Sequence, residues 1–148
     1  MAKKSATTGT ISNRRARFDY ELGDSLVVGI SLTGAETKSL RLGHGQLRGA
    51  YVNVLNDELW LINAQINSSA GVKVTDETRS RKLLAKKSEI EKLMIAKKSG
   101  STIIPLEIIT SSRYIKLRIA VGRGKKRYDK RQIIKRRQAE RETARIKP

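Results

Sequence analysis

Residues 50–66, AYVNVLNDELWLINAQI, carry the clearest sign of the chain's architecture. Two short runs rich in β-branched, aromatic and leucine side chains, 50–55 and 59–66, flank the pair Asn56-Asp57. Asparagine and aspartate favour tight turns because their side chains bond to the local backbone and tolerate the left-handed region. The stretch therefore predicts two antiparallel strands joined by a short turn.

Further strands are expected on both sides of this pair. In 25–33 the apolar residues alternate, so Leu26, Val28, Ile30 and Leu32 share one face. Residues 102–110 and 113–121 form a second pair, in which Pro105 suits a bulge or an edge position. In the last strand one face holds Ile115, Leu117, Ile119 and Val121, and the other holds Lys116 and Arg118.

Two helices are expected between the strands. Thr33 and Glu36 have the spacing of a capping box, which predicts a helix that runs to Arg41 and ends at Gly43. Ser88 and Glu91 have the same spacing before a second helix, which Gly100 ends. Residues 67–78 read as a polar loop. Residues 79–87 suit either an extra helical turn or an extended segment, and the pattern leaves both open.

Short antiparallel strands with two short helices predict a mainly β fold. A small closed barrel of the OB-like type is the natural candidate, because closure removes exposed strand edges. We expect a disordered N-terminal arm over 1–12, the barrel over 13–121 and a flexible basic tail over 122–148. The tail has too few apolar residues for a buried stripe, so we expect it to be disordered when free and helical when bound.

The charge of the chain points to a polyanionic partner. Among 148 residues, 32 are lysine or arginine and 14 are aspartate or glutamate, for a net charge of +18. Residues 113–148 alone carry 15 basic and 3 acidic side chains. A positive field this concentrated favours nucleic acid and makes binding dependent on salt.

Signals for catalysis or a cofactor are poor. The chain has no cysteine, its one histidine is His44 in a glycine-flanked loop, and no carboxylate pair is apparent. Residues 122–126 lack the spacing of a phosphate-binding loop. We expect no enzyme activity, no catalytic residue, no metal and no cofactor. No apolar run has the length of a membrane span or a secretory signal, so we expect a cytoplasmic protein without a membrane partner.

The aromatic residues divide into two groups. Tyr51, Trp60 and Tyr114 lie in predicted strands, where we expect core packing. Tyr128 lies in KKRYDKR, away from apolar neighbours, and is a candidate to stack on a base while nearby cations hold phosphates.

Several segments together resemble the SmpB family of SsrA-binding proteins. They are NRRARFDYEL (13–22), GISLTGAETKSLR (29–41), AYVNVLNDELWLINAQI (50–66), RSRKLL (79–84), STIIPLEI (101–108) and GRGKKRYDKR (122–131). The resemblance implies an OB-type barrel that binds the tRNA-like domain of tmRNA in bacterial trans-translation. It implies delivery to stalled ribosomes together with elongation factor Tu and alanyl-tRNA synthetase. The tail would occupy the small-subunit decoding centre and the empty mRNA channel.

The resemblance also implies the residues of two interfaces. The expected tmRNA-binding residues are Asn13, Arg14, Arg15, Lys38, Arg41, Arg79, Arg81, Lys82 and Leu83. The expected ribosome-binding residues are Lys125, Lys126, Tyr128, Asp129, Lys130, Arg131, Lys135, Arg136, Arg137, Arg141 and Ile146. Of these, Asp129 suits a helix cap, because an acid repels phosphate. We expect a monomer.

Two departures and two alternatives accompany the resemblance. Many relatives carry glutamate two residues before the glycine that matches Gly29, a residue tied to tmRNA binding, whereas this chain has Val27. Residues 74–77 replace a His-Asp-Pro-like stretch. A structural ribosomal or general RNA-binding protein would show no preference for one RNA. An RNA-processing enzyme would need a histidine or carboxylate cluster that the sequence does not display.

Overall fold

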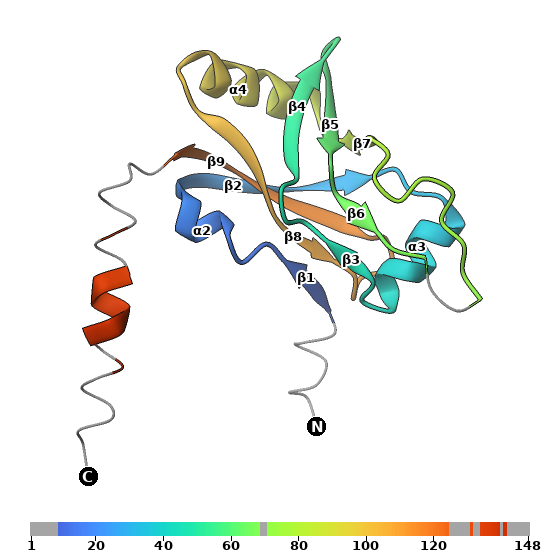
Figure 1. Ribbon diagram of the computed structural model, residues 1–148. Coiled ribbons are helices and arrows are strands. Elements are labelled where there is room, and N and C mark those ends of the chain that lie inside the picture. Colours follow the sequence, from blue (N-terminus) through green and yellow to red (C-terminus); the bar gives the residue numbers. More distant parts are fainter. Residues whose placement is uncertain (1–8, 69–70, 125–130, 132–133, 140, 142–148) are drawn as a thin grey trace.

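The computed structural model describes residues 9–68, 71–124, 131, 134–139 and 141. Its elements form a mainly β fold with a few short helices, as predicted (Figure 1). The strands are β1 (Thr10–Ser12), β2 (Tyr20–Ile30), β3 (Gly45–Gln46), β4 (Tyr51–Leu55), β5 (Glu58–Ile62), β6 (Gln65–Ile66), β7 (Arg81–Leu84), β8 (Thr102–Ile109) and β9 (Lys116–Gly124). The helices are α2 (Ala16–Asp19), α3 (Gly34–Arg41) and α4 (Lys87–Lys98).

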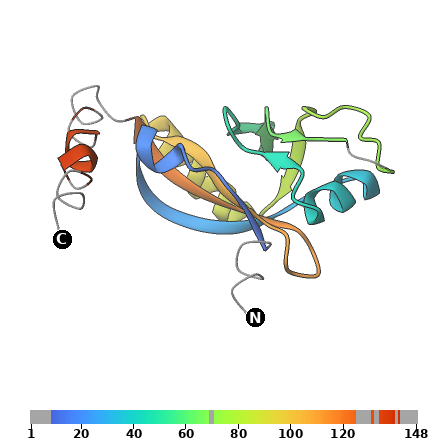
Figure 2. The same ribbon diagram turned by 60° about the horizontal axis from the view of Figure 1, so that its bottom comes forward.

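Six of the strands close into a ring of antiparallel pairs. The large sheet has the order β1-β8-β4-β5-β7-β2-β9, and β9 pairs in addition with β8. Strand β1 adds to β8 outside the ring, and β3 pairs with β6 in a separate small sheet. Helix α4 lies beside the tips of β4 and β5, whereas α3 lies near β3 and β6 at the far side of the molecule (Figures 1 and 2).

The predicted hairpin is present, with one correction. Asn56 and Asp57 have φ angles of 52° and 62°, which is the backbone that a two-residue hairpin turn requires. The expected strand 59–66 is wrong in its length, because β5 ends at Ile62 and Asn63 turns the chain with φ 67°. Residues 65–66 then pair with β3 instead of continuing along β4.

The first predicted helix is confirmed in both its start and its end. The Thr33 hydroxyl accepts from the Glu36 amide at 3.2 Å, and Glu36 Oε1 accepts from the Thr33 amide at 2.9 Å. The helix ends at Arg41, and Gly43 follows with φ 83°, a conformation that favours glycine. This short helix therefore has its boundaries fixed locally.

The start of the second helix differs from its prediction. Helix α4 begins at Lys87, and the Lys86 amide donates to Glu89 Oε1 at 2.8 Å, so Glu89 rather than Glu91 satisfies the first turn. Ser88 lies inside the helix. The two alternatives for residues 79–87 are resolved in favour of an extended segment, because β7 pairs with both β5 and β2.

Three strand boundaries also extend past the predicted ones. Thr10–Ser12, expected in a disordered arm over 1–12, form β1 against β8. Strands β2 and β9 pair with each other as far as Tyr20 and Gly124. Strand β2 therefore begins before the predicted residue 25, and β9 ends after the predicted residue 121. Residues 20–25 lack a clear alternation, and a register shift between Leu22 and Ser25 explains why.

The core fills the inside of the ring. Pro105 lies at a register shift in the β8–β9 pairing, as its residue type predicts. Leu93 of α4 and Leu40 of α3 join the apolar side chains of the strands. The largest fully buried apolar side chains are Leu40, Leu47, Leu59, Leu61, Ile66, Leu83, Ile103, Ile108, Leu117 and Ile119.

The aromatic residues do not follow the prediction. Tyr51 and Tyr114 are 45% and 70% exposed, and Trp60 is half-buried, so the expectation of core packing is wrong for both tyrosines. Successive side chains point to opposite faces of a strand. Val52 and Leu59 point into the core, so their chain neighbours Tyr51 and Trp60 lie on the outer face of the ring.

Replacing Gly122 with alanine is expected to destabilise the closure of the ring. A Cβ atom there would meet Ile104 Cδ1 at 2.6 Å and the Glu21 carbonyl oxygen at 3.2 Å. Crowding of this kind costs about 1–3 kcal/mol. Thermal denaturation measures the effect, and Gly124→Ala is the matched control because nothing lies within 4 Å of its Cβ position. Equal melting temperatures for the two variants would contradict the packing described.

Candidate RNA interface

The capping box of α3 places a carboxylate inside the protein. Glu36 is 1% exposed, and its Oε1 already accepts from the Thr33 amide. A buried carboxylate needs further donors or an opposite charge, because burial without them is costly. The groups that satisfy the Glu36 carboxylate therefore also fix the position of the chain segments from which they come.

Two arginines donate hydrogen bonds to this carboxylate: Arg79, which precedes β7, and Arg81, the first residue of β7. Arg79 NH2 donates to Glu36 Oε1 at 2.6 Å, and Arg81 Nε donates to Glu36 Oε2 at 2.8 Å. Arg81 is 0% exposed and also donates to the carbonyls of Ala64 at 2.8 Å and Glu77 at 3.1 Å. The cluster Glu36-Arg79-Arg81 thus joins α3, β7 and the 67–78 loop.

The cluster is ionised at neutral pH. Burial acts to raise the pKa of Glu36, but hydrogen bonds from Arg79, Thr33 and Arg81 outweigh it and lower the pKa below its ordinary value. Burial also lowers the pKa of Arg81, which the charge of Glu36 opposes. An arginine remains protonated in proteins. Three charges in contact therefore hold this part of the fold together.

The expected RNA contact does not fit two of the residues, because their side chains are buried. The side chain of Arg81 is fully buried, and Leu83, at 2% exposed, belongs to the core. Neither side chain is available to an RNA, because each alternates into the ring along β7. The same alternation places Lys82 and Leu84 outside, and Leu84 is 57% exposed.

Three other expected residues also have structural partners. Asn13 Nδ2 donates to the Pro105 carbonyl at 2.9 Å and holds the start of the chain against β8. Arg41 donates to the carbonyls of Thr110 at 2.9 Å and Arg113 at 2.7 Å, which fastens α3 to the β8–β9 turn. Arg79, whose side chain is 34% exposed, reaches the surface beside Glu36.

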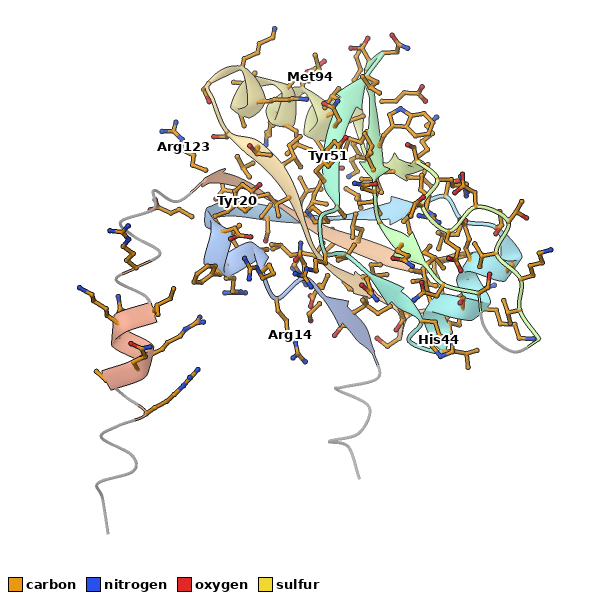
Figure 3. The ribbon with its side chains drawn as sticks, in the orientation of Figure 1. Arg14, Tyr20, His44, Tyr51, Met94 and Arg123 are labelled. Carbon is orange, nitrogen blue, oxygen red and sulfur yellow. The ribbon has the colours of Figure 1, made fainter. Side chains whose placement is uncertain are left out.

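The remaining expected cations of the folded body are exposed. Arg14 projects away from the segment between β1 and α2 (Figure 3). Arg15 lies 5.3 Å from the centre of the Phe18 ring and 3.7 Å from Asp19. Lys38 is exposed on α3, and Lys82 pairs with the exposed side chain of Glu58. His44 is exposed.

A hollow beside α2 brings Arg14 together with two arginines that were not among the expected RNA-binding residues. Arg14, Arg17 and Arg118 line a volume of about 600 Å³, together with the acid Glu107. Glu107 Oε1 accepts from Arg118 Nε at 3.0 Å. A smaller hollow of about 220 Å³ adjoins it, lined by Arg14, Arg15 and Arg48. Positive charge is in excess in both hollows, so this side of the protein suits a phosphate backbone.

A groove of about 760 Å³ lies on the outer side of β2, β7 and β9, next to the start of α4. Its charges balance, with Lys82, Lys86 and Lys116 against Asp57, Glu58 and Glu89. The most exposed apolar side chains in its lining are Leu84 and Val27, and Val27 is 38% exposed. Lys116 lies two residues before Arg118 on the outer face of β9, so the groove and the hollow beside α2 follow one another along this strand.

The expected ribosome-binding residues lie in the last part of the chain. Lys125, Lys126, Tyr128, Asp129, Lys130 and Ile146 fall outside the described residues. Arg131, Lys135, Arg136, Arg137 and Arg141 are described, and all are exposed. Residues 134–139 are helical, and Arg137 lies 5.9 Å from the centre of the Phe18 ring.

Two kinds of feature are absent from the described residues. No group of three or more histidine, cysteine, aspartate or glutamate side chains there is placed to hold a metal ion. Within the same residues, no helix has the length and apolar character needed to cross a membrane.

Comparison with known proteins gives one consistent result. The SmpB protein family model matches residues 10–147. An SsrA-binding protein of Chelativorans sp. (strain BNC1) is 43% identical over 150 residues, covering 99% of this chain and 97% of the relative. The SsrA-binding protein of Streptococcus thermophilus (strain CNRZ 1066) is 41% identical over 137 residues, covering 90% and 89%. A solved chain described as "tmRNA-SmpB: a journey to the center of the bacterial ribosome" matches with a TM-score of 0.67 and 35% identity, over 85% of this chain and 94% of that chain.

Glu36→Gln is expected to lower the free energy of unfolding at pH 7 by about 3–5 kcal/mol, because it leaves the Arg81 cation buried without a counter-charge. The pKa of Glu36 is lowered in the folded protein, so its contribution is present above about pH 4.5 and is lost as the pH falls through the folded pKa. The difference between wild type and variant should therefore shrink in acid. Urea denaturation at pH 7, 5 and 3 measures it.

The control for this measurement is Glu58→Gln. Glu58 pairs with Lys82 at the surface, where the two side chains are 39% and 46% exposed, so its loss should cost less than about 1 kcal/mol. An equal cost for Glu36→Gln and Glu58→Gln at pH 7 would contradict the role assigned to the buried cluster.

Proposed function

The chain belongs to the SmpB family, and we propose that it binds the tRNA-like domain of tmRNA and delivers it to stalled ribosomes for trans-translation. The match of the family model over residues 10–147 carries this proposal. The structure adds a cationic surface along β9 and α2 that suits the backbone of a folded RNA. Shape and backbone contacts are the usual means by which proteins recognise structured RNA.

The folded body is assigned to RNA binding in this proposal. Residues 13–121 would form an OB-like barrel, which the closed ring of strand pairs supports. The RNA would lie along a strip defined by Lys116, Arg118, Arg17 and Arg14, with exposed Val27 and Leu84 at its groove end. Arg15, Lys38, Lys82 and Arg79 are further exposed or partly exposed cations of the body, and exposed Arg41 fastens α3 to the β8–β9 turn, whereas Asn13, Arg81 and Leu83 support the body by structural contacts.

The last segment is assigned to the ribosome. We propose that the segment after β9, residues 125–148, probes the decoding centre and the empty mRNA channel, whose ribosomal RNA is polyanionic. The residues assigned to this contact are Lys125, Lys126, Tyr128, Asp129, Lys130, Arg131, Lys135, Arg136, Arg137, Arg141 and Ile146. The concentration of charge in residues 113–148 supports this division of labour.

The wider setting follows from the same family membership. Elongation factor Tu and alanyl-tRNA synthetase would act with this protein through tmRNA. The protein would work as a cytoplasmic monomer that acts by binding rather than by catalysis. A general RNA-binding protein is the competing function, and it predicts no preference among folded RNAs.

Arg14→Gln and Lys116→Gln test the strip on the body. Each is expected to weaken binding to the tRNA-like domain and to reduce the slope of log K against log salt by about 1, because one phosphate contact is lost. Filter binding over a series of salt concentrations measures both quantities. Lys98→Gln, at an exposed position near the end of α4, is the control and should leave the slope unchanged. Equal slopes for all three variants would remove the strip from the interface.

Truncation after Gly124 tests the division into body and tail. The shortened protein should keep its affinity for the tRNA-like domain, because β9 and the ring remain complete. It should lose peptide tagging on stalled ribosomes in a reconstituted translation reaction. A large loss of affinity for the RNA in the truncated protein would contradict the division.

A further inference from the structure

An aromatic face on the outside of β4 and β5 has no role in the interface described so far. Tyr51 is 45% exposed and Trp60 is half-buried, while Val52, Leu59 and Leu61 point into the core from the same strands. Ile62 lies on the outer face as well and is also half-buried. Tyr51 is seen on β4 near the middle of the molecule in Figure 3.

The strand register brings these side chains together. Tyr51 pairs with Ile62, and Asn53 pairs with Trp60. Tyr51 and Trp60 are therefore diagonal neighbours across the pair, at about 7–8 Å between Cα atoms, which aromatic side chains span. The register therefore places Tyr51, Ile62 and Trp60 next to one another on the outer face. We call the set Tyr51, Ile62 and Trp60 the aromatic face.

Charged residues surround the aromatic face unevenly. Lys82, the register partner of Trp60 on β7, forms an ion pair with Glu58, and the Lys97 ammonium contacts the Asn53 side chain from the end of α4. The acids Asp57 and Glu58 lie at the tip of the β4–β5 hairpin, at the end away from Tyr51. A polyanion would therefore cross the aromatic face near Tyr51, because the two acids at the hairpin tip would repel it.

The aromatic face also continues into the groove. Lys82 belongs to both, and the next outward residue on β7 is Leu84, which lines the groove. From β4 to β9 the outer surface thus runs from Tyr51 and Trp60 through Lys82 and Leu84 to Lys116. A ligand bound along β9 has a direct path to the aromatic face.

We propose that the aromatic face stacks an unpaired base of the RNA bound along β9, an inference that rests on the proposed function. Aromatic side chains stack on a base of any sequence, and neighbouring cations hold the flanking phosphates. Paired bases are inaccessible inside an A-form helix, so the face selects nucleotides from loops. A tRNA-like RNA offers such loops, whereas a plain duplex does not.

Trp60 supplies a direct reporter, because it is the only tryptophan in the chain. Its fluorescence is followed while the full chain is titrated with the tRNA-like domain of tmRNA or with a blunt RNA duplex of equal length. Stacking predicts quenching that saturates with the tRNA-like domain and no matching change with the duplex. Binding of the tRNA-like domain with unchanged Trp60 fluorescence overturns the inference.

Tyr51→Ala provides the matched variant. Loss of a stacking partner should weaken binding of the tRNA-like domain by roughly tenfold, since one stacked base contributes about 1–3 kcal/mol. The salt slope should stay unchanged because no phosphate contact is removed. Tyr51→Phe should keep the affinity, and so should Tyr114→Ala, which removes an exposed tyrosine from the β8–β9 turn. Circular dichroism verifies folding of each variant.

The outcomes separate this inference from the function on which it rests. Tight, selective binding by wild type that Tyr51→Ala leaves intact overturns the aromatic face and keeps the proposed function. Normal RNA binding by Tyr51→Ala combined with loss of binding to a protein partner likewise overturns base stacking at the aromatic face and keeps the proposed function. Equal, weak binding of all RNAs by wild type overturns the proposed function itself, and the aromatic face as an RNA site with it.

Discussion

The rest of the structure depends on the contact of one buried carboxylate, Glu36, with Arg79 and Arg81. Glu36 begins α3, and Arg81 lies in β7, which pairs with β5 on one side and with β2 on the other. The short strand β7 completes the ring, and the buried ion pair fixes its position. Without Glu36, the Arg81 guanidinium would be a buried cation whose described partners are only backbone carbonyl oxygens. Such a state is costly, so the capped helix, the loop and the ring are coupled through this contact.

The arginines of this chain consequently divide between two tasks. Arg81 bonds to carbonyl oxygens and a carboxylate inside the fold, and Arg41 bonds at the surface to carbonyl oxygens of the β8–β9 turn, so both hold the outer surface in place. Arg14 and Arg118 face the hollow beside α2, which is the proposed place of the RNA backbone. A rigid frame matters for a protein that recognises RNA by shape, because the spacing of its cations must match the spacing of phosphates. In the proposed function, net charge brings the RNA to the surface and the frame determines which RNA fits.

Local features of the sequence predicted local features of the structure. The Asn56-Asp57 turn, the Thr33-Glu36 capping box and the helix end at Gly43 all follow from residue chemistry within a few positions. The side chains of 79–84 could not be assigned this way, because RSRKLL alternates without showing which face is buried. Arg81 is inside only because Glu36 lies 45 residues away in the chain and next to it in space. Likewise, β1 forms only against β8, and Tyr51 is outside because of the register with β5.

The most direct measurement compares two RNAs on the purified full chain at increasing salt: the tRNA-like domain of tmRNA and an ordinary elongator tRNA. Recognition by a shaped surface predicts tighter binding of the tRNA-like domain, with the preference persisting at physiological salt. Attraction by charge alone predicts equal affinities that fall together on a steep salt slope. A persistent preference supports a tmRNA-binding body built on the Glu36 cluster, and equal affinities would contradict it.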